Sequence, residues 1–463
     1  MRILIPLLTF LLLNTLTGFS FWSCLGIAIW LAYVVHFLSK LNTSVAFREY
    51  ILMMYGLNYL FSPALTYEVT QNIAIYKMRL TPETYFSIAI PAMLCMHAGM
   101  FLLKSKIFTY SFYTDRIKTL VNEQLLKVWL IVGVILGMST SFFPGDIGFM
   151  VYLLSGIKYV AAFSLFIIDR KKYKWYLIAI LAMEVLGSLR AGMFHDTVVW
   201  ILFFSIVWTY IKKPSASTKF VLGSLAIVIL FVLQSVKGMY REQLRAGTEG
   251  GFGTFSTAFS KGSDSKAGLF NMNNFALSLT RANQGWIFSS AMQNTERKHN
   301  FQQMKLVKIY AEAAFLPRAL APNKLEAGDT KIFNEFSGIR ILKGTSMGLG
   351  LFADGYISYG YFGTLIFAFV FGLICALVFK LIERWSAISP FFTFFAFTLL
   401  NFAVRADCET QTWMGHIVKG IVVFSILMYF TRQYFYRKSL AIREHTEETS
   451  ADQDLSVAPQ LVS

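Results

Sequence analysis

Long apolar runs recur along the chain and are separated by short polar segments. No Lys, Arg, Asp or Glu occurs from Ile3 to Ser39, and this stretch is too long for one helix across a hydrocarbon core of about 30 Å. It predicts two spanning helices with a break near Gly18-Phe19-Ser20. A signal peptide is the alternative interpretation of the first run, but no small-residue cleavage site is visible and a second span follows at once.

Further apolar runs have the length and composition of membrane spans. They are Ile51–Tyr67, Tyr85–Leu103, Val128–Phe143, Ile147–Ile168, Trp175–Leu189, Thr197–Ile211, Phe220–Leu233, Tyr356–Phe379, Pro390–Ala403 and Trp413–Phe430. Pro144-Gly145-Asp146 predicts a tight turn between two of them. The pattern therefore predicts an all-α polytopic membrane protein with about twelve transmembrane helices.

The overall composition agrees with a membrane protein. Among the 463 residues, 56% are hydrophobic and only 15% are charged, whereas soluble proteins average about 45–50% and about 25%. The net charge of +16 would suggest nucleic acid as a partner of a soluble protein. Here Lys and Arg flank the predicted spans, which favours the cytoplasmic leaflet as their partner and not nucleic acid. The cysteines and histidines show no metal-binding spacing, and we expect no metal site.

The distribution of Lys and Arg in the short loops predicts the orientation of the spans. The basic segments are Lys40 with Arg48, Lys104–Lys127, Arg170–Lys174, Lys212–Lys219, Lys380 with Arg384, and Arg432–Arg443. They fall on one side of the membrane, with Lys77 and Arg79 as the main exception, and the positive-inside rule makes that side cytoplasmic. Both termini are then cytoplasmic.

This topology predicts four parts. Residues 1–233 hold transmembrane helices 1–9, residues 234–348 form a large extracytoplasmic loop, residues 349–432 hold helices 10–12, and residues 433–463 are a polar, disordered cytoplasmic tail. The start of the loop, Gly247 to Gly268, is rich in Gly and Ser and is expected to be mobile. Long loops of this kind are usually functional.

Charged groups in and near the spans are the candidates for chemistry. Lys158 and Glu184 lie within neighbouring spans, either as a structural ion pair or as a proton relay or substrate contact. Other candidates cluster on the predicted outer face. Arg190, His195 and Asp196 lie in or just after a short turn at 187–192. Arg405, Asp407 and Glu409 lie in another turn, with His416 and Lys419 just inside the following span. These groups are either rim salt bridges or a site for a phosphate-bearing ligand, which arginine binds bidentately.

The predicted loop contributes three more groups of residues. They are Lys237, Tyr240, Arg241, Glu242 and Arg245; the stretch Leu316–Lys324 with Pro317, Arg318 and Pro322; and Gly344-Thr345-Ser346-Met347-Gly348 followed by Asp354-Gly355-Tyr356 and Gly360–Gly363. Each group alone is also compatible with simple loop packing. The glycines permit a close approach of the backbone.

Taken together, these motifs resemble the Wzy-type oligosaccharide repeat unit polymerases, also called O-antigen polymerases. The Pro-Arg…Pro-x-Lys stretch, the Gly-Thr-Ser-x-Gly stretch and the acidic-Gly-Tyr…Gly-x-x-Gly segment carry the resemblance most closely, from Pro317 to Gly363. The Ser188-Leu189-Arg190-Ala191 turn is similar to that family and to the O-antigen ligases. Where many members carry Glu, this chain has Asp354.

The resemblance implies a glycosyltransferase of the lipid-donor (GT-C-like) class in the bacterial inner membrane, without a cofactor. Its substrate would be a polyprenyl-pyrophosphate-linked glycan, polymerised at the outer face into O-antigen, capsular polysaccharide or exopolysaccharide, with a chain-length regulator and a flippase as partners. Cations must stabilise the departing pyrophosphate and a base must accept the proton of the acceptor hydroxyl. The candidate catalytic residues are Arg190, Arg241, Arg318, Asp354, His195 and Glu242, and the candidate substrate-binding residues are Arg245, Lys324, Arg405, His416 and Tyr356.

Other functions remain open on the sequence. An O-antigen ligase would differ only in its acceptor. A transporter or flippase of lipid-linked glycans would often show inverted repeats, and none is evident here. A membrane acyltransferase is a further alternative, although His195 and Asp196 are adjacent and not spaced as expected.

Overall fold

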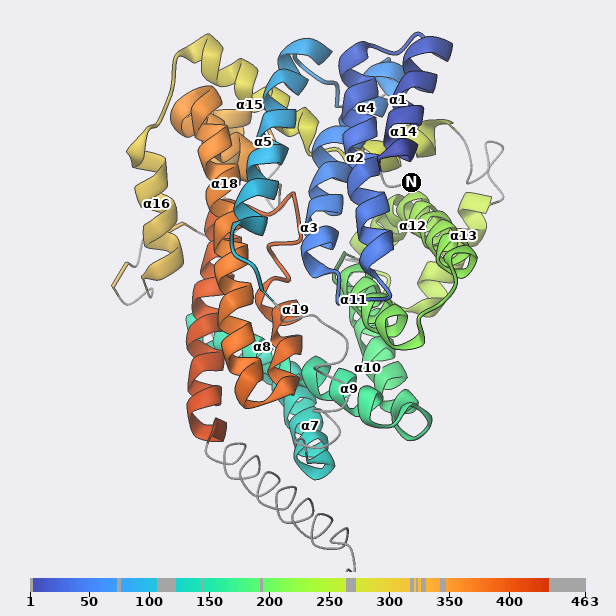
Figure 1. Cartoon of the computed structure of the whole chain (residues 1–463), viewed down its shortest axis with the longest axis vertical. Coiled ribbons are helices and arrows are strands. Elements are labelled where there is room, and N and C mark those ends of the chain that lie inside the picture. Colours follow the sequence, from blue (N-terminus) through green and yellow to red (C-terminus); the bar gives the residue numbers. More distant parts are fainter. Residues whose placement is uncertain are drawn as a thin grey trace, which may run out of the picture.

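The structure is a computed structural model. It describes residues 3–432 except for 73–75, 106–121, 144, 192–194, 264–271, 317–319, 322–323, 326–329 and 342–346. These residues form an all-α protein (Figure 1). Seven of its helices are long and apolar enough to cross a membrane. They are Phe21–Lys40, Pro82–Leu102, Glu123–Phe142, Ile147–Ile168, Ala216–Arg245, Leu351–Ile388 and Thr410–Arg432.

The described residues therefore do not show the twelve spans that the apolar runs predicted. Three apolar helices are too short to be counted: Leu4–Leu16, Thr197–Lys212 and Pro390–Leu399. The helix α10 (Arg170–Ala191) has the length but carries basic residues at both ends. The basic segment Arg170–Lys174 thus belongs to a helix and not to a loop, because Lys and Arg have high helix propensity.

The N-terminal part consists of α1 (Leu4–Leu16), α2 (Phe21–Lys40) and one irregular helical stretch. That stretch comprises α3 (Phe47–Gly56), the π-helical segment η1 (Leu57–Phe61), α4 (Ser62–Leu65) and the π-helical segment η2 (Thr66–Thr70). Pro63 explains part of the irregularity, since it has no N–H for the carbonyl one turn earlier. That carbonyl, of Tyr59, instead accepts a hydrogen bond of 2.9 Å from the Tyr85 hydroxyl.

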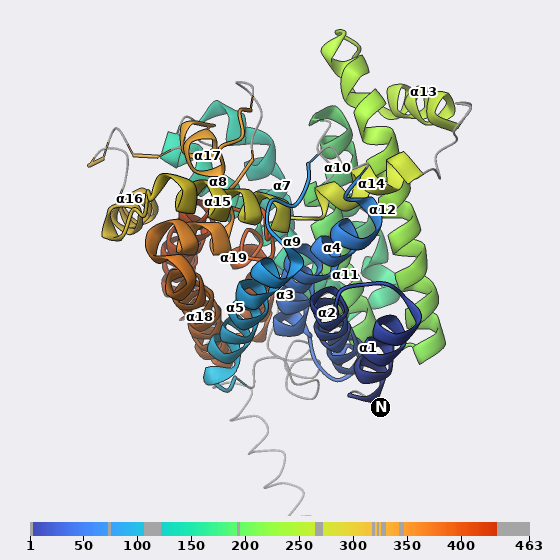
Figure 2. The same ribbon diagram turned by 90° about the horizontal axis from the view of Figure 1, so that it is seen from above.

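A close helix crossing joins α5 (Pro82–Leu102) to α18 (Leu351–Ile388), which lie side by side in Figures 1 and 2. Gly99 of α5 lies against the backbone of Phe369, and Gly372 of α18 lies against the backbone of Met96. Small residues permit this approach between apolar helices, where packing and not the hydrophobic effect drives association in a bilayer.

The helix α18 consists of two helices joined by a sharp turn at Tyr359 and Gly360, where Gly360 has φ of +63°. The first part folds back so far that the backbone of Gly355 touches that of Gly363. Thr364 Oγ1 also lies 3.4 Å from the carbonyl oxygen of Phe352. The glycines of this motif therefore serve the packing of the chain on itself.

The predicted span at 147–168 is interrupted at Gly156, which separates α8 (Gly145–Ser155) from α9 (Ile157–Ile168). Gly145 has φ of +56°, in keeping with the predicted turn, although Pro144 lies outside the described residues. The neighbouring elements are α7 (Glu123–Ser139), the 3₁₀ turn η3 (Thr140–Phe142) and α11 (His195–Lys212).

The described residues do not show the large loop that the sequence predicted at 234–348. The helix α12 (Ala216–Arg245) continues through the first residues assigned to the loop. The segment that follows is a series of short helices: α13 (Phe252–Ser263), α14 (Met272–Arg281), α15 (Gly285–Lys298), α16 (Met304–Phe315) and α17 (Thr330–Ser337). Most of α15 is buried, and α13 lies within the stretch expected to be mobile. Figure 2 shows α12 along one side of the molecule, with α13 beside one of its ends.

The segment Pro390–Glu409 does not form the predicted span. It contains the 3₁₀ helix η4 (Pro390–Phe394), the short helix α19 (Phe395–Leu399) and a stretch without regular structure. Nearly all of its side chains are buried, including Phe395, Ala403 and Val404. Irregular backbone at membrane depth is tolerated only where protein or a water-filled space surrounds it, and this segment borders the cavity described below.

Candidate functional site

A cavity of about 440 Å³ lies between α7, α8, α9, α10 and α11 on one side and the segment Thr398–Asn401 and helix Thr410–Arg432 on the other. Its volume is in the range of small-molecule sites. Its polar lining consists of Thr140, Tyr152, Ser155, Lys158, Tyr159, Glu184, Arg190, Trp200, Thr398, Asn401 and His416. A polar interior between such apolar helices is costly and points to a function.

Lys158 and Glu184 form an ion pair in this lining, with 3.0 Å between Lys158 Nζ and Glu184 Oε1. Their side chains are only 12% and 20% exposed. Gly133 of α7 lies against the backbone of Lys158, so the absence of a side chain there lets α9 come close enough to bring Lys158 into place. The predicted pairing of these two residues is confirmed.

Arg190 reaches the cavity from the last turn of α10, where a positive charge also complements the helix dipole. The sequence placed it in or after a short turn, but the helix runs on to Ala191. The Tyr240 hydroxyl of α12 donates a hydrogen bond of 2.6 Å to the carbonyl of Leu189, and Gly250 lies against the backbone of Arg190. These contacts hold the end of α10 in place.

His416 enters the cavity from helix Thr410–Arg432 and is 1% exposed. Its Nε2 lies 2.7 Å from the carbonyl oxygen of Thr398, and its ring packs on Phe402 with 4.6 Å between centroids. The guanidinium of Arg405 stands 4.5 Å from the same Phe402 ring. The structure thus brings Arg190 and His416 to one cavity, with Arg405 behind one aromatic ring.

Asp354 does not line the cavity and has a structural role. It is 1% exposed, and its Oδ1 accepts a hydrogen bond of 2.7 Å from the Tyr310 hydroxyl of α16. Its Oδ2 accepts hydrogen bonds from the Thr410 hydroxyl at 2.6 Å and the Thr410 backbone N–H at 3.2 Å. Burial and the Asp354 charge raise the pKa of Tyr310 well above its ordinary value, so Tyr310 remains a donor. Asp354 therefore caps the helix that carries His416.

Most of the other predicted site residues do not line the cavity, and one of them, Tyr356, is buried. Tyr356 donates a hydrogen bond of 2.7 Å to Glu296 Oε1, and Lys324 Nζ donates one of 2.7 Å to the carbonyl of Leu316. Three more are exposed on α12: Arg241, Glu242 and Arg245. Arg318 lies outside the described residues, and the side chain of His195 is not among those described, although its backbone begins α11.

A cationic stripe follows one face of α12. Gln234, Lys237, Arg241 and Arg245 are three or four residues apart and so share that face. Arg281 of α14 joins it, because its Nη1 donates hydrogen bonds to the carbonyl of Gln234 at 2.8 Å and to its side-chain oxygen at 2.9 Å. Arg281 was not predicted from the sequence, because nothing in its local surroundings distinguishes it.

Thr398 and Asn401 of the cavity lining were also missed. Both are buried, at 6% and 2% exposure. The signal was present in the sequence, because Asn401 is the one amide in the long apolar run from Pro390 to Val404. An uncompensated amide in such a run usually needs a polar partner.

Comparison with known proteins identifies a family without an assigned activity. Residues 45–388 match the family described as Domain of unknown function (DUF8712). The chain belongs to this family. The matched segment of this DUF8712 protein includes Lys158, Glu184 and Arg190, whereas Thr398, Asn401 and His416 follow it. No curated protein and no solved structure matches the chain significantly.

Proposed function

We propose that the protein is a membrane glycosyltransferase that polymerises polyprenyl-pyrophosphate-linked oligosaccharide repeat units at the outer face of the bacterial cytoplasmic membrane. The product would be O-antigen, capsular polysaccharide or exopolysaccharide. The observation that carries the proposal is the partly open, cation-bearing cavity bordered by apolar helices. The resemblance of the motifs to Wzy-type polymerases supports the same reaction class.

The cavity chemistry suits a pyrophosphate leaving group. When the sugar is transferred, negative charge develops on the departing pyrophosphate, and fixed cations beside it stabilise that charge. Arg190 offers a planar guanidinium that binds phosphate oxygens in pairs. Lys158 offers a second charge, held by Glu184 at 3.0 Å until the anion arrives.

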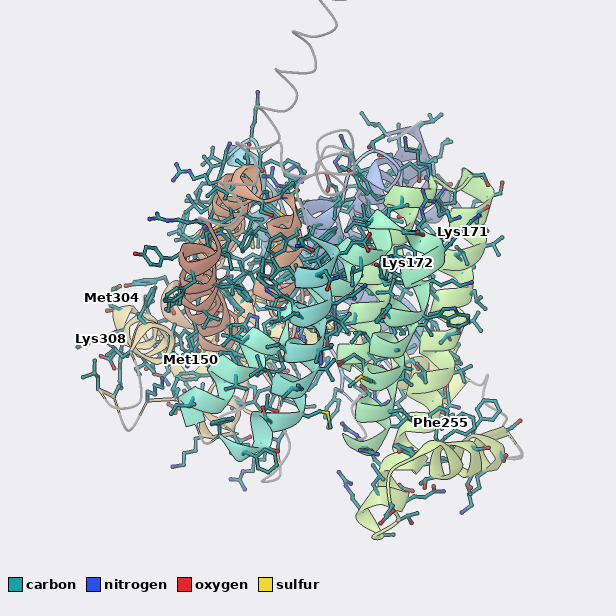
Figure 3. The ribbon with its side chains drawn as sticks, turned by 90° about the horizontal axis from the view of Figure 1, so that it is seen from below. Met150, Lys171, Lys172, Phe255, Met304 and Lys308 are labelled. Carbon is teal, nitrogen blue, oxygen red and sulfur yellow. The ribbon has the colours of Figure 1, made fainter. Side chains whose placement is uncertain are left out.

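The position of the cavity along the helices fits an outward-facing site. Thr140 follows the C-terminal end of α7, and Arg190 stands at the C-terminal end of α10. The basic residues Arg170 to Lys174 occupy the opposite end of α10 and are cytoplasmic by the positive-inside rule. In Figure 3, Lys171 and Lys172 lie toward one end of the molecule and Phe255 of α13 toward the other. An outward site is where a flipped lipid-linked donor would arrive.

Two alternatives have support of their own. An O-antigen ligase would use the same donor and the same cations with another acceptor. A transporter of lipid-linked glycans is favoured by the Lys158–Glu184 pair within the helices and by the broken segments at Tyr359-Gly360 and Pro390–Glu409. Paired charges and discontinuous helices near the membrane centre are common in transporters.

One reconstitution separates these functions. The purified protein in vesicles is given polyprenyl-pyrophosphate-linked repeat units as the only glycan. We expect products lengthened by whole repeat units. Movement of the lipid-linked glycan across the bilayer without lengthening would replace the polymerase with a transporter. Transfer only after addition of a different acceptor, such as a lipid A core, would indicate a ligase. In cells, gene deletion is expected to leave glycans of one repeat unit.

A further inference from the structure

The tautomer of His416 is fixed by its contact with the backbone. A carbonyl oxygen can only accept a hydrogen bond, so the Nε2 that lies 2.7 Å from the Thr398 oxygen must carry the proton. In a neutral imidazole the other nitrogen is then unprotonated and carries a lone pair. That nitrogen, Nδ1, is buried and has no hydrogen-bond partner among the described residues.

Two neighbours in the lining present unsatisfied atoms as well. Thr398 Oγ1 and Asn401 Oδ1 are buried and lack a partner within the described part of the chain. Both residues border the same cavity as His416. Buried polar atoms are nearly always hydrogen-bonded. Other unpartnered buried atoms occur elsewhere in the described residues, but these three share one wall of a cavity, which favours a ligand that supplies their partners.

The missing partners are hydrogen-bond donors. His416 Nδ1 and Asn401 Oδ1 can only accept, and Thr398 Oγ1 can accept or donate. Phosphate oxygens offer acceptors and would not satisfy them. A sugar hydroxyl offers an O–H, and a sugar ring offers several hydroxyls at the spacing of neighbouring side chains. This wall therefore differs in chemistry from the cationic wall of Lys158 and Arg190.

We propose that the wall formed by Thr398, Asn401 and His416 binds the hydroxyl groups of the acceptor sugar and that His416 is the general base of the transfer. The proposal rests on the proposed function. His416 Nδ1 accepts the proton of one acceptor hydroxyl while that oxygen bonds to the anomeric carbon of the donor. The bond from that carbon to the pyrophosphate oxygen breaks, and its electron pair leaves with the polyprenyl pyrophosphate. The proton on His416 later passes to the leaving group or to water.

The packing around His416 suits this role. Asp354 caps the start of its helix through Thr410, and Phe402 and Phe149 pack on the ring with centroids at 4.6 and 5.8 Å. The imidazole is therefore held in one orientation with Nδ1 as the free nitrogen. A base in a fixed orientation is what proton transfer at a bound hydroxyl requires.

The substitution His416→Gln tests the base directly. The glutamine amide can keep the hydrogen bond to the Thr398 carbonyl but cannot accept a proton. We expect turnover in the vesicle assay to fall about 100-fold, with binding of the lipid-linked repeat unit unchanged. The matched control is His97→Gln, because His97 stacks on Tyr33 and Phe101 in α2 and α5, outside the cavity lining. It should lengthen glycans at the rate of the wild type.

The outcomes separate the base from the function. A wild type that neither binds nor lengthens the lipid-linked repeat unit overturns the proposed function. A wild type that lengthens it, together with a His416→Gln variant of equal turnover, overturns the base alone. Thr398→Val and Asn401→Leu should raise KM for the acceptor several-fold with a smaller change in kcat. An unchanged KM in both would remove the sugar from this wall.

A spectroscopic measurement keeps the inference testable if a variant does not fold. In ¹⁵N NMR of the wild-type protein with labelled histidine, His416 should show an unprotonated Nδ1 and a protonated Nε2. Its signals are assigned by their absence in His416→Gln or, if that variant is unstable, in His416→Asn. A protonated Nδ1 at neutral pH would overturn the proposal, since that nitrogen could not accept a proton.

Discussion

Lys158 of α9 and Glu184 of α10 hold each other at 3.0 Å in the wall of a polar cavity. Removing one partner leaves an unpaired, mostly buried charge, so we expect Lys158→Met or Glu184→Gln to lower the free energy of unfolding by about 3 kcal/mol. The double variant should regain most of that loss. Thermal unfolding in detergent measures both effects. If the double variant lost as much free energy of unfolding as the two single variants together, the two side chains would not be coupled.

Arg190 is predicted to act on the leaving group. Arg190→Ala should lower the rate of lengthening about 100-fold, the usual cost of losing one group that stabilises developing charge. Arg190→Lys keeps the charge but not the planar pair of donors, so an intermediate loss is expected. Arg170→Ala is the matched control, because Arg170 is exposed at the opposite end of the same helix. Equal rates in Arg190→Ala and the control would exclude Arg190 from the site.

Asp354 is predicted to be a structural residue and not a base. In Asp354→Asn, one oxygen must serve the donors that two now serve, and the cap of helix Thr410–Arg432 is weakened. We expect a loss of stability of about 2 kcal/mol, against about 1 kcal/mol in Tyr310→Phe. Thermal unfolding decides the matter. Unchanged stability with complete loss of activity in Asp354→Asn would instead make Asp354 catalytic.

The two ends of the molecule are predicted to lie on opposite sides of the membrane. A reporter that is active only outside the cytoplasm should be active when fused near Ser263, at the end of α13. The same reporter should be silent near Lys172, which lies toward the other end of the molecule in Figure 3. The opposite pattern would move the cavity of Arg190 to the cytoplasmic half and exclude a donor arriving from outside.

Lengthening is expected to continue in the presence of a chelator. Arg190 and Lys158 both line the cavity, and in the proposed mechanism they supply the positive charge at the leaving group, so no divalent ion is required. Activity should also weaken at high salt, which screens the attraction between phosphate and the exposed arginines of α12. Loss of lengthening on chelation, with recovery on adding magnesium, would show that a metal shares this task.

The apolar pattern predicted helices better than it predicted spans. All the predicted runs overlap helical segments, Pro390–Ala403 only in part, because length and hydrophobicity are local properties. The predicted ends of the helices were less accurate than their positions in the sequence. The helix α12 continues to Arg245 because Met239 to Arg245 consist mostly of good helix formers, although they are polar. The breaks at Gly156 and Gly360 depend on what packs there, which a hydropathy pattern does not contain.

The candidate site was predicted in part for the same reason. Arg190 and His416 stood out as charged or titratable groups beside apolar runs, and the structure brings both to one cavity. Asp354 stood out equally but is used by Tyr310 and Thr410. Nothing local distinguishes these cases, because the partners are far away in the sequence. Thr398 and Asn401 are ordinary residues whose importance comes only from the helices opposite them.

The fold-back of α18 limits how this chain can change over evolutionary time. At Gly355 and Gly363 an added Cβ would meet main-chain atoms of the other glycine, and at Gly363 also the Cβ of Tyr359, which every residue except glycine carries. A larger residue at one position therefore cannot be accommodated by a smaller residue elsewhere. Only a different path of the backbone would relieve the clash, and that path also carries Asp354 and its cap on the helix of His416. Homologues that retain this turn should hold glycine at both positions, whereas those that lose one should differ at the other and in the cavity.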